Sequence, residues 1–294
     1  MLLRLGFGAI RALRPAYEAH NGGVPILNKD MSLCISLAAR PSNYGTRFHN
    51  FLYDEIGLNF IYKAFTTTNI TDAIAGVRAL GIRGCSVSMP FKEAVIPLVD
   101  ELEPSAAAID SVNTIVNDDG RLTASNTDYE AVVQLLAQRQ LDPALPVLLR
   151  GSGGMAKAVV AAFRGAGFND LTIVARNAEA GRALAERYDF AAVTEDPEPG
   201  HAVLVNVTPL GMQGSDAEAL AFSEAHVAAA KYVFDVVALP AETPLIRAAQ
   251  AAGVPTISGA EVFALQAAGQ FRRYTGVELT MEQIERAAAF AREA

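Results

Sequence analysis

The sequence predicts an α/β protein with parallel strands and two domains. From Ser32 onward, short apolar or β-branched runs alternate with segments of helical periodicity, which is the pattern of βαβ units. The length of 294 residues is about twice that of a single domain. Hydrophobic residues make up 51% of the chain, enough to bury a core in each of two domains.

Composition argues against several classes of function. No run reaches the roughly 18 apolar residues of a membrane-spanning helix, so no membrane partner is expected. The net charge is -8 and no block of basic residues is present, so no nucleic acid is expected as a partner. Cys34 and Cys85 lie in apolar runs, which is typical of reduced core cysteines in a cytoplasmic protein. The four histidines have no metal-ligand spacing, so no metal site is predicted.

Residues 1–25 carry Arg4, Arg11 and Arg14 among apolar residues, which loosely resembles a basic targeting segment. Gly6 and Gly8 interrupt that pattern. We interpret the segment as an over-read start or a loosely attached extension, with a targeting role as the alternative.

The first half predicts strands at 33–37, 60–65 and 85–87, separated by helices near 47–56 and 70–80. These crossovers imply parallel pairing. Asp119-Gly120 stands between two apolar-rich runs and predicts a hairpin, which adds an antiparallel corner to the sheet.

The second half begins with a helix at 128–139, and the domain crossing is expected near Asp128. Pro143 and Pro146 then mark a loop. Four further strands and two helices follow, and the tail at 260–294 is helical by pattern. The strands are predicted at 147–149, 171–175, 202–207 and 232–237, and the helices at 155–165 and 178–188.

A glycine-rich loop follows the strand at 147–149. Its sequence, Gly151-Ser152-Gly153-Gly154-Met155-Ala156, matches G-x-G-x-x-A at the start of an Ala- and Val-rich helix. Gly151 allows a tight turn and Gly153 lets the backbone approach a pyrophosphate at the helix N-terminus. The pattern predicts a dinucleotide site, and a plain structural turn is the alternative.

Arg176 ends the strand at 171–175, where an NAD-specific enzyme places an acidic residue. A guanidinium can pair with a 2′-phosphate, so the sequence predicts NADP rather than NAD, with a solvated loop cation as the alternative. Asn206 and Thr208 stand at the end of the strand at 202–207, as a loop beside the nicotinamide would, although a plain strand exit explains them equally well.

Lys92 and Asp128 are the candidate catalytic groups. Lys92 follows Ser86 and Ser88, which share one face of a strand, and stands near a predicted helix start, where a cation is unfavourable. Beside a carboxylate it could exchange a proton with a substrate hydroxyl, although an exposed surface lysine is an equal alternative. Asp128 is a candidate carboxylate or an N-cap, and Asn113 a pocket amide or a turn residue.

These segments together resemble the shikimate dehydrogenase family over most of the chain, from about Ile26 to the C-terminal helices. The matching segments lie at 86–92, 112–114, 126–128, 151–154, 206–212, 242–245 and 266–268. The resemblance implies an α/β substrate domain at 26–127 and 258–294, with a Rossmann-type NADP-binding domain at 128–257. The C-terminal helices would return to the substrate domain.

The resemblance also implies roles for individual residues. Lys92 and Asp128 would be the catalytic pair, and the ring substrate would contact a group of polar side chains from the first domain and the tail. Those expected substrate contacts are Asn43, Thr46, Ser86, Ser88, Asn113 and Gln266. The expected cofactor contacts are Gly151, Ser152, Gly153, Gly154, Met155, Ala156, Arg176, Asn206, Thr208, Val236 and Gly259.

By resemblance, the protein would be a cytoplasmic NADP-dependent shikimate 5-dehydrogenase of aromatic amino acid biosynthesis, monomeric or homodimeric. Two serines that grip the substrate carboxylate in the family are absent at 43–46, Ser86 and Ser88 replace Asn and Thr, and Ala238 replaces a pocket tyrosine. These departures, together with the segment Arg-Pro-Ser-Asn-Tyr-Gly-Thr at 40–46, resemble the divergent shikimate dehydrogenase-like branch. They imply low activity on shikimate.

Two alternatives remain open. One is a dehydrogenase for quinate or an amino analogue, with Asn43, Thr46 and Arg47 supplying new polar contacts. The other is a non-catalytic NADP-binding regulatory module. Retention of both Lys92 and Asp128 counts against the second alternative, because a binding module has no need of that pair.

Overall fold

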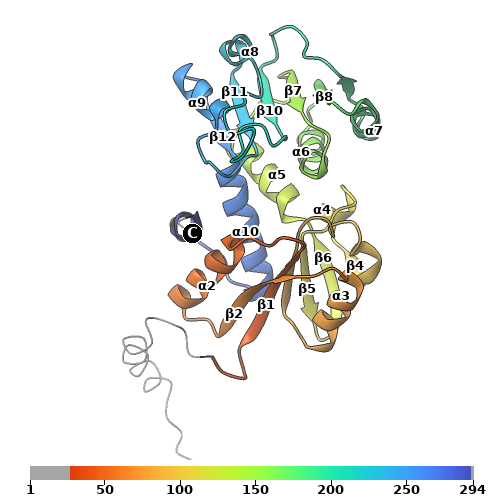
Figure 1. Ribbon diagram of the computed structural model, residues 1–294, viewed down its shortest axis with the longest axis vertical. Helices are drawn as coiled ribbons and strands as arrows, with labels where there is room; N and C mark the ends of the chain where they lie inside the picture. The colour runs from red at the N-terminus through yellow and green to blue at the C-terminus, as the bar shows by residue number, and fades with distance from the viewer. Residues whose placement is uncertain (1–26, 293–294) are drawn as a thin grey trace, which may run out of the picture.

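A computed structural model describes residues 27–292 and contains two six-stranded sheets, one above the other in Figure 1. This arrangement confirms the predicted α/β class. Residues 1–25, for which an extension or a targeting segment is predicted, lie outside the described part of the chain. Within residues 27–292, no helix is long and apolar enough to cross a membrane.

The lower sheet has the strand order β2-β1-β3-β5-β6-β4. Its strands are β1 (Ser32–Ala38), β2 (Phe60–Thr66), β3 (Gly84–Val87), β4 (Glu101–Leu102), β5 (Thr114–Asp118) and β6 (Arg121–Ser125). The strand β1 pairs in parallel with β2 and β3, whereas β5 pairs antiparallel with β3 and β6. Asp119 and Gly120 both have positive φ and form the predicted hairpin turn.

Helices cover both faces of the lower sheet. Along β1, Cys34 packs in the cluster that contains α2 (Tyr44–Ile56), whereas Ile35 and Leu37 pack in the cluster that contains α3 (Ile70–Ala79). This alternation follows the two-residue period of a strand. A short helix, α4 (Pro104–Ala107), precedes β5.

The helix expected to start near Lys92 is absent. A turn follows Pro90, and Ile96–Leu98 forms a single 3₁₀ turn, η1. Pro97 lacks the N–H that a helix interior requires, which accounts for the difference. Lys92 therefore lies in a turn and not at a helix N-terminus.

The upper sheet is parallel, with the strand order β12-β11-β10-β7-β8-β9. Its strands are β7 (Val147–Arg150), β8 (Leu171–Val174), β9 (Ala191–Val193), β10 (Val203–Asn206), β11 (Tyr232–Asp235) and β12 (Thr256–Ser258). This is the doubly wound order of dinucleotide-binding domains, in which the order reverses between the first and fourth strands, here β7 and β10. Ligands of such sheets bind outside the carboxyl ends of the strands at that point.

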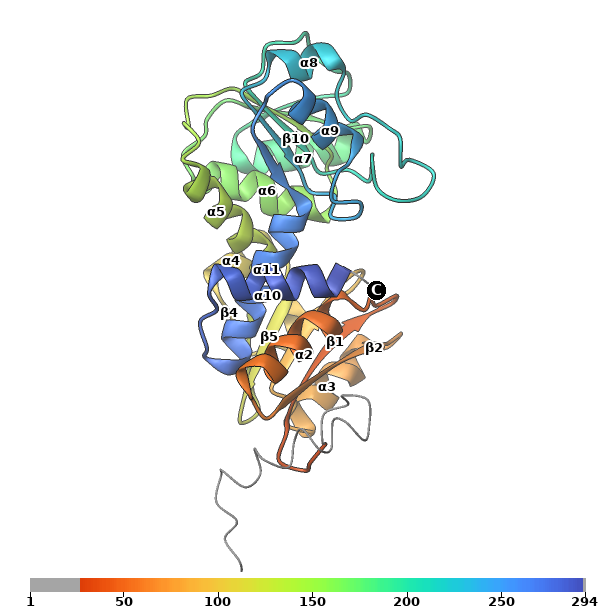
Figure 2. The same ribbon diagram turned by 90° about the vertical axis from the view of Figure 1, so that its left-hand side faces the viewer.

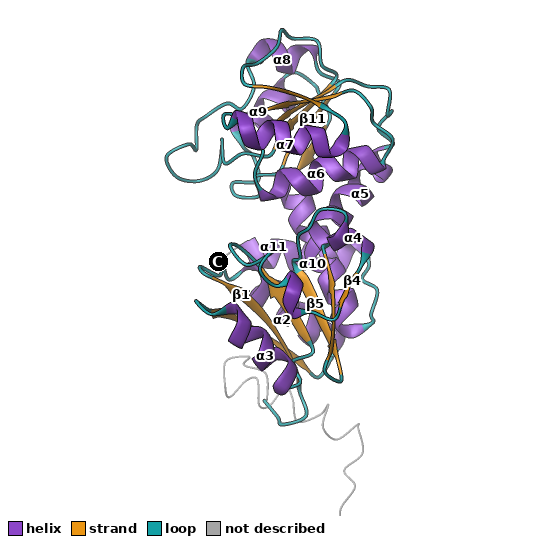
Figure 3. Ribbon diagram, turned by 90° about the vertical axis from the view of Figure 1, so that its right-hand side faces the viewer, coloured by secondary structure: helices purple, strands orange, loops and turns teal. Residues whose placement is uncertain are grey.

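The upper sheet is also covered on both faces (Figure 3). The helices α6 (Gly154–Gly165) and α7 (Ala178–Tyr188) share one apolar cluster with alternate residues of β7 and β8. The opposite face packs against α8 (Glu224–Ala229) and α9 (Pro244–Ala251).

Two long helices join the sheets. The helix α5 (Thr127–Arg139) leads from β6 to the upper sheet, and α10 (Gly259–Thr275) returns from β12 to pack against α5 and the lower sheet. Gly276 has a φ of 73° and ends α10. The last helix, α11 (Met281–Arg292), lies beside α2 (Figure 2). The predicted helical tail is therefore two helices.

Candidate active site

A cavity of about 280 Å³ opens at the carboxyl ends of β1 and β3, and the first turn of α5 and the middle of α10 complete its wall. Most of its polar lining carries hydroxyl or amide groups. The polar residues that line it are Ser36, Arg40, Ser42, Tyr44, Tyr62, Ser86, Ser88, Lys92, Asn113, Asp128, Gln266 and Gln270.

Lys92 and Asp128 meet in this cavity. Lys92 Nζ lies 2.6 Å from Asp128 Oδ2, and the two side chains are 28% and 14% exposed. Asn126, not Asp128, is the N-cap of α5, because its side chain accepts a hydrogen bond from the Tyr129 N–H. Asp128 therefore occupies the first helical turn, where the helix dipole favours a carboxylate, and its side chain is free to bind Lys92.

Asn113 is buried beside this pair, at 2% exposure. Its Oδ1 accepts hydrogen bonds from the Thr127 N–H at 2.8 Å, from Thr127 Oγ1 at 3.1 Å and from Thr114 Oγ1 at 2.7 Å. The carbonyl side of the amide is thus fully used in positioning α5. Within residues 27–292 no acceptor binds Asn113 Nδ2, which leaves that N–H₂ group as a donor for the cavity.

Two glutamines of α10 line the same cavity. Gln266 Oε1 lies 3.5 Å from Thr127 Oγ1. Gln270, which the sequence analysis missed, donates through Nε2 to Ser86 Oγ and Thr114 Oγ1, both at 3.3 Å. Gln270 follows Gln266 by four residues and so lies on the same helix face, a spacing that would have indicated it.

Tyrosines form another part of the wall that the sequence analysis missed. Burial raises the pKa of Tyr62, opposed by hydrogen bonds with Ser36 and Ser86, so its phenol stays protonated. A Cβ added to Gly45 would lie 3.3 Å from Tyr62 Oη, so the glycine gives the phenol room beside α2. Burial raises the pKa of Tyr44 to about 12, and Tyr44 Oη is buried without a hydrogen-bond partner.

Two residues predicted to contact substrate, Asn43 and Thr46, do not line the cavity, and neither does Arg47, which the alternative of a related ring acid added. Asn43 is exposed at the start of α2, and Thr46 Oγ1 is buried without a partner, and neither lines the cavity. Arg47 turns toward α11, where its guanidinium donates to the Phe290 carbonyl oxygen at 2.7 Å and lies 4.1 Å from the Phe290 ring centre. The helical turn of α2 directs these side chains elsewhere; Ser42 and Tyr44 line the cavity instead.

The glycine loop lies between β7 and α6 as expected. Gly151 has a φ of 123°, and a Cβ there would lie 2.8 Å from Val207 Cγ2, so only glycine fits. A Cβ on Gly153 or Gly154 would meet nothing within 4 Å, so the approach to the start of α6 is open. No side chain caps this helix, which leaves its first N–H groups available to an anion.

Arg176 follows β8 and is exposed. Among residues 27–292 it forms no hydrogen bond or ion pair, while its neighbour Asn177 caps α7. The guanidinium is therefore available to a ligand at the same edge of the sheet as the glycine loop.

Asn206 and Gly259 have structural roles that the sequence did not reveal. Asn206 is fully buried, donates to Asp235 Oδ1 at 3.0 Å, and accepts from Thr208 Oγ1 at 2.6 Å, so it orders the loop after β10. Burial raises the pKa of Asp235. A Cβ on Gly259 would lie 2.3 Å from the Val236 carbonyl oxygen, so Gly259 permits close contact between α10 and the loop after β11.

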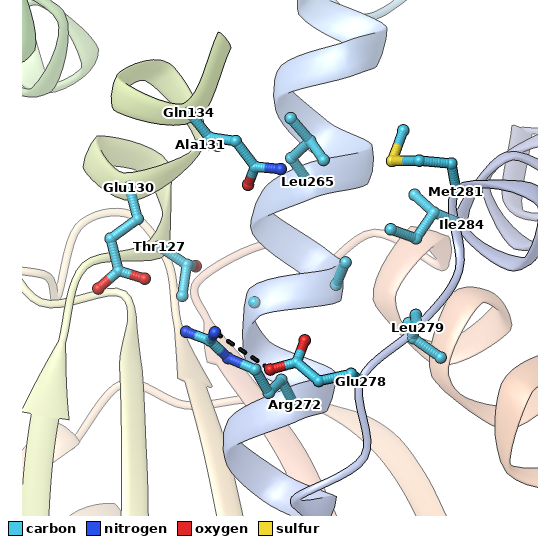
Figure 4. A pocket seen from close by; sticks show the side chains of 12 residues that line it. Thr127, Glu130, Ala131, Gln134, Leu265, Arg272, Glu278, Leu279, Met281 and Ile284 are labelled. Atoms are coloured by element: carbon cyan, nitrogen blue, oxygen red, sulfur yellow. Dashed lines mark hydrogen bonds and ion pairs between the residues drawn. The ribbon is translucent and has the colours of Figure 1, made fainter. Parts of the chain in front are cut away.

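A second cavity, of about 310 Å³, lies between α5, α10 and the segment before α11 (Figure 4). Its charged side chains are already paired: Arg272 with Glu278 at 3.3 Å, and Glu130 with Arg273 at 2.6 Å. No group of His, Cys, Asp and Glu within residues 27–292 is arranged to hold a metal ion. Of these two cavities, the one that holds Lys92 and Asp128 is therefore the candidate active site.

Known proteins resemble this chain along most of its length. A sequence profile of the shikimate dehydrogenase substrate binding domain matches residues 44–115. The chain is 57% identical over 268 residues to a shikimate dehydrogenase-like protein of Haemophilus influenzae, an alignment that covers 91% of this chain and 99% of that protein. It is 36% identical over 260 residues to a shikimate dehydrogenase (NADP(+)) of Chlorobaculum tepidum, covering 81% of this chain and 88% of that protein.

Solved structures agree with these relatives. The shikimate 5-dehydrogenase of Thermus thermophilus, in complex with NADP(H) and shikimate, matches with a TM-score of 0.79 at 29% identity, covering 88% of this chain and 99% of that chain. Sequence and fold therefore lead to the same group of proteins and confirm the predicted resemblance. The chain belongs to the shikimate dehydrogenase family, alongside its shikimate dehydrogenase-like members.

Proposed function

We propose that this protein is an NADP-dependent oxidoreductase of the shikimate dehydrogenase type, which interconverts shikimate and 3-dehydroshikimate or a closely related hydroxylated ring acid. The observation that carries the proposal is the contact of 2.6 Å between Lys92 and Asp128 inside a cavity lined by hydroxyl and amide groups. A relative with the same fold binds NADP(H) and shikimate.

The reaction needs one proton and one hydride. NADPH, when bound, supplies the hydride to the carbonyl carbon of the ring, and NADP accepts it in the reverse direction. The Lys92 ammonium donates a proton to the carbonyl oxygen as it becomes a hydroxyl, and takes the proton back during oxidation. Asp128 holds Lys92 in place through their ion pair and can accept a hydrogen bond from the same hydroxyl.

The chain offers a group for each part of the cofactor. The open N-terminus of α6 suits the pyrophosphate, and the unpaired Arg176 suits the 2′-phosphate. In this proposal residues 128–257 bind NADP, while residues 26–127 and 258–294 hold the ring substrate. Thr208 and Val236 would lie beside the nicotinamide.

The test is NADPH formation by purified protein with NADP and shikimate, with quinate and NAD in parallel and Lys92→Ala as the blank. We expect slow turnover of shikimate that requires Lys92, because the serine pair of the family is absent at 43–46. Turnover that persists in Lys92→Ala would refute the assignment. A protein that binds NADP but oxidises neither acid would instead point to a different ring substrate or to the non-catalytic module.

Replacing Arg176 with Asp should weaken NADP binding by about 10- to 100-fold, the worth of a charge-assisted hydrogen-bonded pair. The carboxylate would also repel the 2′-phosphate, while the affinity for NAD should change little or rise. Fluorescence titration of both nucleotides measures the two dissociation constants. Equal losses for NADP and NAD would show that Arg176 does not read the 2′-phosphate.

A further inference from the structure

We propose that Arg40 is the residue that recognises the carboxylate of the substrate and so determines specificity for an acid. The inference rests on the proposed function, because it assumes that the cavity with Lys92 and Asp128 holds the ring.

The balance of charge in the cavity carries this inference. The charged residues among its lining are Arg40, Lys92 and Asp128. Lys92 and Asp128 neutralise each other at 2.6 Å. Arg40 is exposed, and it forms no hydrogen bond, ion pair or ring contact with any residue in 27–292. The cavity therefore carries an uncompensated positive charge, which is located on Arg40.

The position of Arg40 also determines how an acid would be oriented in the cavity. Arg40 follows β1, and the preceding residue, Ala39, donates its N–H to the Met89 carbonyl oxygen at 3.3 Å, which holds this segment at the cavity edge. Asp128 repels a carboxylate, and the Arg40 guanidinium can bind one through parallel hydrogen bonds. The acid group should therefore lie toward Arg40 and a ring hydroxyl toward Lys92.

The remaining lining suits the neutral part of such a molecule. Ser36 and Ser42 line the cavity with hydroxyl groups, which can bind ring hydroxyls but add no charge. The segment at 43–46, which follows Arg40 closely, lacks the two serines expected by resemblance for the carboxylate. An ion pair from Arg40 would replace those two hydroxyl contacts.

The experiment compares shikimate with its methyl ester, which keeps the ring hydroxyls but lacks the charge. Steady-state kinetics at saturating NADP are measured for the wild type, Arg40→Gln and Arg40→Lys. Arg40→Gln should raise KM for shikimate by about 10- to 100-fold, the usual loss for a hydrogen bond to a charged group. KM for the ester should stay within about twofold, and Arg40→Lys should recover part of the loss because it keeps the charge.

Arg182→Gln serves as the matched control, because Arg182 is an exposed arginine of α7 without a hydrogen bond or ion pair to residues 27–292. It should change neither KM. An equal loss for acid and ester, or an unchanged KM for shikimate in Arg40→Gln, would each overturn the proposal.

Failure of the proposed function is a separate result. If the wild type oxidises neither substrate, calorimetric titration of the NADP-loaded protein with shikimate replaces the kinetics. Binding that is lost in Arg40→Gln would still support the role of Arg40. Binding that is unchanged in that variant, or undetectable in the wild type, would overturn it.

Discussion

Replacing Lys92 with alanine is expected to lower kcat for shikimate oxidation by about 10²- to 10⁴-fold, the usual contribution of a general acid or base. The substitution removes the proton carrier and leaves Asp128 without its partner at 2.6 Å. The loss should appear in kcat more than in KM for the ring substrate, because the hydroxyl and amide lining of the cavity remains.

The controls separate chemistry from folding. The dissociation constant for NADP should be nearly unchanged. Lys92 lies in the turn that follows β3 of the lower sheet, whereas the glycine loop lies between β7 and α6 in the upper domain. Lys63→Ala, which removes an exposed lysine of β2, should retain full turnover. A Lys92→Ala protein with wild-type kcat would contradict the expectation. So would a loss of activity that thermal denaturation traces to an unfolded variant.

Replacing Gly259 with alanine should destabilise the protein by about 3 kcal/mol or more, at the upper end of overpacking effects. The new Cβ would lie 2.3 Å from the Val236 carbonyl oxygen and 2.4 Å from the Val237 carbonyl carbon. Both atoms belong to the backbone and cannot rotate away. Because α10 begins at Gly259 and runs to the lower sheet, relieving the contact requires the helix or the loop after β11 to move.

Urea denaturation measures this effect, and Gly76→Ala is its matched control. Gly76 lies within α3, where an added Cβ meets nothing within 4 Å. Alanine there should stabilise the protein by about 0.5–1 kcal/mol, because it favours the helix. If the two variants unfolded at the same urea concentration, the close backbone contact at Gly259 would not govern stability.

Local patterns predicted most of the longer elements. Strands and helices such as β1, β2, α3 and α7 are long enough for their periodicity to show, and Asp119-Gly120 predicted its hairpin from turn chemistry alone. Short elements such as β4 and α4 contain too few residues to show a period. The turn after Pro90 was misread as a helix start, because the effect of Pro97 was not weighed.

The residues that line the cavity also fall into those that a local motif predicted and those that it did not. Motifs that are continuous in sequence, at 86–92, 112–114 and 126–128, selected several residues that the structure brings together. No local pattern selected Arg40, Tyr44 or Tyr62 as a cavity residue, and Gln270 was left out although it lies four residues after Gln266. Their presence depends on how α10, α2 and β2 pack around β1, which involves contacts between segments far apart in the chain.

By itself, the sequence determined the α/β class, the family and the glycine loop, because each depends on residue types at fixed local spacing. Only the tertiary structure decided that Asn43, Thr46 and Arg47 turn away from the cavity, that Asn126 rather than Asp128 caps α5, and that Gly259 is required by a backbone contact. Side-chain direction, hydrogen-bond satisfaction and steric room are properties of packing between distant segments, and local spacing does not encode them.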